Sequence, residues 1–236
     1  MDANIDLNGG QLQNADLTRA DLTRANLTRA NLSGANLIGA DLTRAKLSGA
    51  NLTGAKLIGG SLWNANLSNA NVTGANLSNT RLWSANLTGA NLTDANLTGA
   101  NLWKANLGNA NLNRTVFARS GVEGSVFADS RWNGTLINGI DLRTVGELNL
   151  GEHENPSSVG VDTLYLTAGG LPLSEMPEPY RGFFIACGVN PELFEAKQLG
   201  ALELLRQVTG ELAGKQQSGI LGASAPAGAL AAGDED

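Results

Sequence analysis

The sequence predicts an all-β solenoid with four sides and about seven coils, followed by a small C-terminal region with one strand and one α-helix. Two observations carry this prediction. A five-residue period runs through more than half of the chain, and outward-facing residue types recur in every fourth unit of that period.

The five-residue period is the dominant feature of the chain. From Leu12 to Leu112 in steps of five there are 21 positions, of which 20 are Leu and one is Val72. The same phase extends from Leu7 to Leu142, which makes 28 units without an insertion, and a small residue, usually Ala, stands two places before each position from Leu12 to Ile137. Neither a helix nor a flat strand has a period of five, so each unit is expected to turn a corner of about 90°.

A second, longer period indicates that four units complete one coil. Trp63, Trp83 and Trp103 recur at intervals of four units, each directly after a Leu of the repeat. Ile38 and Ile58 recur at the same spacing in the same slot. Residues four units apart are therefore expected to lie above one another on one side of a four-sided solenoid, and such units are stable only when stacked.

Units such as ADLTR, ANLTG and ANLSN resemble the tandem repeats of the pentapeptide repeat family. The resemblance covers residues 5–142, more than half of the chain. It implies a right-handed quadrilateral β-helix over 1–142, with coils about 4.8 Å apart.

Beyond the repeats, the composition changes. Residues 143–160 are rich in Gly, Ser, Asn and Glu and are predicted to be a linker, and DTLYLTA over 162–168 is predicted to be a strand. Within 161–217, an apolar face and an N-terminal Asn-Pro-Glu predict a helix over about 191–213. This region is expected to be a cap, a tether or a homodimerisation element. Residues 218–236 are small and acidic and are expected to be disordered.

The composition argues against an enzyme, a metal site and a cofactor site. There is one His, His153, and one Cys, Cys187, and neither has a catalytic partner at a recognisable spacing. Walker, Rossmann and zinc-protease motifs are missing from the sequence. There is neither a signal-peptide pattern nor an apolar run long enough for a membrane helix, so we expect a cytoplasmic protein without membrane contact.

Charge provides a test for nucleic-acid partners. Residues 1–142 hold 11 Lys and Arg against 9 Asp and Glu, whereas residues 143–236 hold 5 against 13. A solenoid this close to neutrality is a poor polyanion binder. A candidate basic patch lies in the first three coils, with solubilising surface charge as the alternative interpretation. Its members are Arg19, Arg24, Arg29, Arg44, Lys46 and Lys56.

The family resemblance also implies one specific activity, protection of DNA gyrase by mimicry of duplex DNA. Mimicry needs an acidic face along the solenoid, and here the acids are scattered among bases. A regular file of hydroxyls, which includes Thr53, Thr73 and Thr93, leaves ice binding as a minor alternative.

The file of Trp63, Trp83 and Trp103, with Ile38 and Ile58 on the preceding side, is the principal candidate surface. Stacked outward indoles make a patch large enough to mark an interaction site. Either the C-terminal region folds over the file, or the file is open to a protein partner or a second copy of the chain. We therefore predict a non-enzymatic scaffold that binds an unidentified protein through one face of the solenoid.

Overall fold

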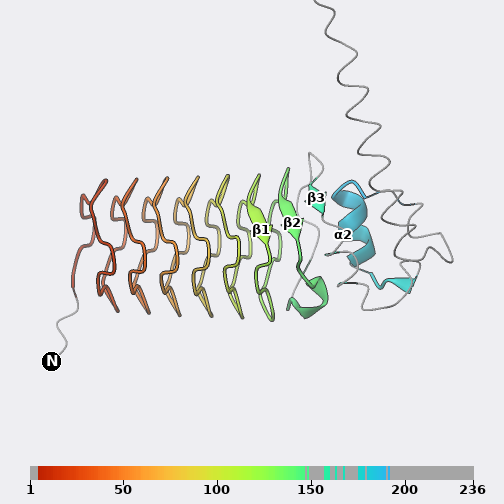
Figure 1. Cartoon of the computed structure of the whole chain (residues 1–236), viewed down its shortest axis with the longest axis horizontal. Coiled ribbons are helices and arrows are strands. Elements are labelled where there is room, and N and C mark those ends of the chain that lie inside the picture. Colours follow the sequence, from red (N-terminus) through yellow and green to blue (C-terminus); the bar gives the residue numbers. More distant parts are fainter. Residues whose placement is uncertain are drawn as a thin grey trace, which may run out of the picture. The chain divides into compact units, whose positions relative to one another are not determined.

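The computed structural model describes residues 5–146, 148, 157–159, 163, 167, 175–178, 180–189 and 191. The chain divides into two compact units, Met1–Lys197 and Gln198–Asp236, and every described residue lies in the first. The repeats form a stack of four-sided coils, seen edge-on in Figure 1. The family fold predicted from the sequence, a right-handed quadrilateral β-helix, is confirmed.

The four-unit period is the register of the stack. Parallel pairing joins each residue before a repeat Leu to its counterpart in the next coil, as in Asn31 with Asn51 and Asn51 with Asn71. The Leu52 N–H donates to the Asn71 carbonyl at 2.7 Å, and Ala55 N–H closes the corner on the Leu52 carbonyl at 3.0 Å. One unit therefore pairs with the next coil and also makes its own turn.

Two inward positions per unit explain the spacing of Leu and Ala. From Leu22 onward the central residue of each unit is buried, and from Ala25 onward so is the residue two places before it. The last residue of each unit has a positive φ, for example +64° at Gly74 and 59° at Arg24. This conformation, together with the hydrogen bond across the corner, is that of a type II turn, which favours Gly and Asn.

Near the end of the stack the pairing lengthens into strands. β1 (Val116–Ala118), β2 (Leu136–Asn138) and β3 (Ser158–Val159) form a parallel sheet in that order. The 3-10 helix η1 (Leu142–Thr144) follows β2, and helix α2 (Tyr180–Ala186) lies further along the chain. β3 and part of η1 fall within the segment predicted to be a linker. The linker prediction was wrong there, because β3 continues the register of the coils.

The predicted strand over 162–168 was also wrong where it is described. Thr163 and Thr167 have helical backbone. The Thr163 hydroxyl accepts from Ile140 N–H at 3.3 Å, and the Thr167 hydroxyl accepts from Leu142 N–H at 3.1 Å. In a strand, residues four apart are separated by about 13 Å. Helical backbone at Thr163 and Thr167 instead accompanies hydroxyls that lie on amides two residues apart, and these tertiary contacts outweigh the β-propensity of the sequence.

Aromatic side chains fill the end of the stack. Trp132, which occupies a Leu position, lies 5.0 Å from Phe127 and 5.2 Å from Phe183 of α2, measured between ring centroids. Phe183 and Phe184 are fully buried. The helix predicted over 191–213 lies outside the described residues apart from Pro191, as does the predicted tail over 218–236.

Candidate interaction face

Three tryptophans, together termed the Trp file, lie along one side of the coil stack. Trp63, Trp83 and Trp103 directly follow buried Leu residues, so their side chains leave the solenoid on the outer side. Their exposed fractions are 44%, 41% and 36%, whereas Trp132 at a central position is 1% exposed. The same residue type is thus a core residue or a surface residue according to its slot in the repeat.

The rings of the Trp file contact one another and nearby cationic side chains. Trp83 and Trp103 meet edge to face, with centroids 6.1 Å apart and planes at 64°. The Arg44 guanidinium lies 5.8 Å from the ring centroid of Trp63, and Lys104 Nζ lies 4.2 Å from that of Trp103. The negative faces of the indoles therefore already attract cations of the same chain.

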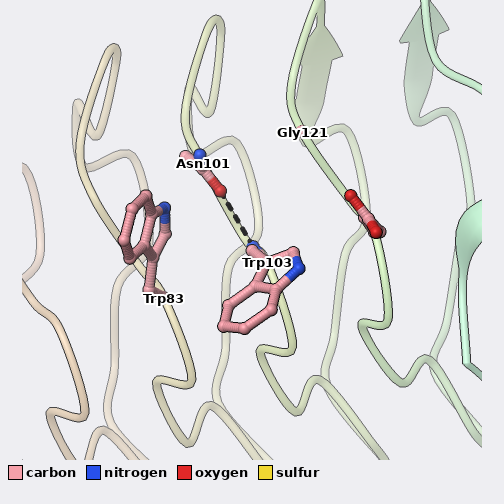
Figure 2. Close-up of a pocket in the computed structure, with 5 residues that line it drawn as sticks. Trp83, Asn101, Trp103 and Gly121 are labelled. Carbon is pink, nitrogen blue, oxygen red and sulfur yellow. Dashed lines mark hydrogen bonds between the residues drawn. The ribbon is translucent and has the colours of Figure 1, made fainter.

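A groove of about 350 Å³ opens beside the last two indoles. Figure 2 shows Trp83, Asn101, Trp103 and Gly121 on three neighbouring coils. Glu123 completes the lining and is exposed. Asn101 Oδ1 accepts from the Trp103 backbone N–H at 3.0 Å, which fixes the start of the turn that carries the indole.

Gly121 makes room for the groove. It pairs in parallel with Asn101 of the preceding coil and has no side chain where the other coils carry Asp, Ser, Arg or Asn. An added Cβ would lie 3.6 Å from Asn101 Oδ1, so the position accepts a small side chain without strain. The sequence prediction missed Asn101, Gly121 and Glu123. The signal was present, because positions 101 and 121, like 83, 103 and 123, are four units apart.

The other predicted surface residues are less prominent. Ile38 and Ile58 lie on the preceding side, as predicted, but both are half-buried. They therefore add little apolar area to the Trp file.

The six basic residues do not gather into one patch. All are exposed, but residues five apart lie on successive sides of the coil, so Arg19, Arg24 and Arg29 point to three different corners. Of the six, only Arg24 and Arg44 share a corner, because they are four units apart. The patch was predicted because the six residues fall in the first three coils, whereas the register distributes them over several sides of those coils.

The hydroxyls of the file that includes Thr53, Thr73 and Thr93 already make local hydrogen bonds. Thr53, Thr73 and Thr93 each donate to the amide oxygen of the Asn two residues earlier, at 2.6 Å. Those hydroxyls are left as acceptors toward solvent.

The described residues show little that resembles catalytic chemistry. Burial raises the pKa of the Cys187 thiol to about 12, so this thiol is not an activated nucleophile. In the described part of the chain, no three His, Cys, Asp or Glu residues come together as a metal site would require. No helix in that part is long and apolar enough to cross a membrane. His153 lies outside the described residues.

Comparison with known proteins agrees with the repeat geometry. The model of the family described as pentapeptide repeats matches residues 5–44, 45–83 and 75–114. No curated protein sequence matches the chain significantly.

Solved structures give the same result. HetL from the cyanobacterium Nostoc sp. Strain PCC 7120, a pentapeptide repeat protein involved in heterocyst differentiation regulation, is 29% identical, with a TM-score of 0.50 over 66% of this chain and 73% of HetL. Another pentapeptide repeat protein from Nostoc Pcc 7120 is 32% identical, with a TM-score of 0.33 over 51% of this chain and 84% of its own.

QnrB1, a plasmid-mediated fluoroquinolone resistance protein, is 20% identical, with a TM-score of 0.33 over 66% of this chain and 90% of its own. At that identity the match concerns the fold alone. The family model, the two Nostoc proteins and the uninterrupted five-residue units all agree: the chain belongs to the pentapeptide repeat family.

Proposed function

We propose that this protein is a non-enzymatic scaffold that binds a protein partner through the Trp file. The observation that carries the proposal is the exposure of Trp63, Trp83 and Trp103 on one side of the stack. Indoles are among the residues that contribute most to binding energy when a partner removes them from water. Three in register on a rigid scaffold bind at low entropic cost, because the coils hold them in place before the partner arrives.

The geometry favours a protein partner over single-stranded nucleic acid. Bases stack on aromatic faces that are open and parallel to them. In the Trp file the two neighbouring rings meet at 64°, and cations of the same chain lie against Trp63 and Trp103. The similarity to HetL, a pentapeptide repeat protein involved in heterocyst differentiation regulation, supports a regulatory setting for such a scaffold. No observation favours gyrase protection or ice binding, and both stay predictions.

The experiment compares two triple variants on different sides of the same stack. Trp63, Trp83 and Trp103 are replaced by Ser in one, and Thr53, Thr73 and Thr93 are replaced by Ser in the other. Circular dichroism is expected to be unchanged in both, because all six side chains lie outside the core. A photo-crosslinking residue at exposed position 81, beside Trp83, with exposed position 71, beside Thr73, as the control, then identifies proteins bound at the file.

We expect a crosslinked partner from position 81 that the Trp variant loses and the Thr variant keeps. Purified, this partner is expected to bind the wild type at least tenfold more tightly than the Trp variant, which corresponds to about 1.4 kcal/mol for three interface indoles. Equal binding to both variants would contradict the proposal.

A further inference from the structure

We infer that the groove beside Trp83 and Trp103 binds a positively charged side chain, an arginine of the partner protein. The inference rests on the proposed function and names the chemistry that the partner presents at one end of the Trp file. Three features support it: the walls of the groove, its charge, and the cations that the same file already holds.

The walls suit a flat cation. Trp83 and Trp103 come from neighbouring coils and stand edge to face, with centroids 6.1 Å apart, so a ring face and a ring edge border the same space (Figure 2). A guanidinium group stacks on an indole face more readily than an ammonium group does, because it is planar and less strongly hydrated. Gly121 leaves space for the stem of such a side chain at the next coil.

The charge of the lining points the same way. Among the five lining residues, Glu123 alone is charged. Its carboxylate presents two acceptor oxygens, which match the paired N–H groups of a guanidinium. Arg143, which stands four units after Glu123, donates through Nε to Asp141 Oδ1 at 2.9 Å and forms an ion pair with that side chain. Arg143 is thus already engaged by an acid two residues before it.

The file itself shows that its indoles accept cations. Arg44 and Lys104 lie 5.8 Å and 4.2 Å from the ring centroids of Trp63 and Trp103. Neither residue is part of the lining of the groove. A partner arginine in the groove would repeat between two chains the contact that the chain makes with itself, with Glu123 as an added counter-charge.

The test uses the full chain and two short peptides, Ac-Gly-Arg-Gly-NH₂ and the same peptide with citrulline in place of arginine. Citrulline keeps the shape of the side chain and removes its charge. The chain has four tryptophans, so a ¹⁵N-labelled sample gives four indole N–H signals, assigned by single Trp→Phe variants. We expect the arginine peptide to shift the Trp83 and Trp103 signals in a saturable way while Trp132 stays unchanged.

Two charge-removing variants on the same side of the stack separate the groove from general electrostatics. Glu123→Gln is expected to weaken the arginine peptide about three- to fivefold, the range of an exposed ion pair, and to leave the citrulline peptide unaffected. Asp41→Asn is the matched control, because Asp41 lies four coils away and its Oδ1 accepts from Thr43 N–H at 2.9 Å, a bond that Asn also makes. We expect this control to bind like the wild type.

Three results would overturn the inference: equal binding of both peptides, equal weakening by Glu123→Gln and Asp41→Asn, or preference for a peptide with Glu in place of Arg. The proposed function and the arginine inference can fail independently of each other. If the Trp→Ser triple variant loses its crosslinked partner while Glu123→Gln retains full affinity for it, the Trp file is the interface and the arginine assignment is wrong.

Discussion

Replacement of Phe183 by Ala tests whether α2 closes the end of the coil stack. The Phe183 ring is fully buried and lies 5.2 Å from Trp132 and 5.7 Å from Phe184. Removing a buried Phe side chain costs about 3–5 kcal/mol when the site cannot collapse around the space. In a solenoid each coil contacts its neighbours only, so this loss is expected to loosen the last coil and leave the central coils intact.

The assay is acrylamide quenching of a single reporter. Replacing Trp63, Trp83 and Trp103 by Phe leaves Trp132 as the remaining tryptophan. In this background Phe183→Ala is expected to make Trp132 accessible to quencher, with little change in circular dichroism. Ile185→Ala is the matched control, because Ile185 lies in the same helix and is 38% exposed. If Trp132 stays as protected in Phe183→Ala as in the parent, α2 is not what keeps water from the end of the core.

Two further predictions concern the turns and the buried thiol. Gly74 has φ +64° with nothing within 4 Å of an added Cβ, so Gly74→Ala is expected to cost about 1 kcal/mol from backbone conformation alone. Gly121→Ala, where φ is not positive, is expected to be neutral or to stabilise by about 0.5 kcal/mol, and urea unfolding measures both; equal effects would refute the turn argument. The pKa of the Cys187 thiol is raised to about 12, so a thiolate-specific reagent is expected to label native protein slowly even at pH 9 and urea-unfolded protein rapidly. Because the unfolded thiol ionises near pH 8.5, the stability it contributes is present below that pH and is lost as the pH rises toward 12; rapid native labelling at pH 8 would contradict the burial.

The repeat region was predictable from the sequence because its structure is local and periodic. A buried Leu every five residues and a small residue two places earlier already specify the corner, and the recurrence of Trp63, Trp83 and Trp103 specifies four corners per coil. The sequence predictions failed where the spacing of five residues per side and four units per coil was not applied. Arg19, Arg24 and Arg29 were grouped as neighbours although five residues correspond to one side of the coil.

The sequence predicted only some of the residues that line the groove. The two indoles were recognised because a tryptophan is conspicuous, whereas Gly121 acts through the side chain that it lacks. The missing side chain matters only once Asn101 is known to lie beside it on the preceding coil. The role of Glu123 likewise becomes apparent only from its position four units after Trp103, on the same side of the stack.

The sequence by itself determined the solenoid, its register and the side on which the tryptophans stand, since each follows from the spacing of residues along one regular path. The tertiary structure alone decided how the stack ends. There the Thr167 hydroxyl reaches the Leu142 amide and Phe183 reaches Trp132, contacts between segments far apart in the chain. No period links those segments. Their pairing is fixed by the need to satisfy the last coil's amides and cover its aromatic core, which becomes apparent only once that coil is in place.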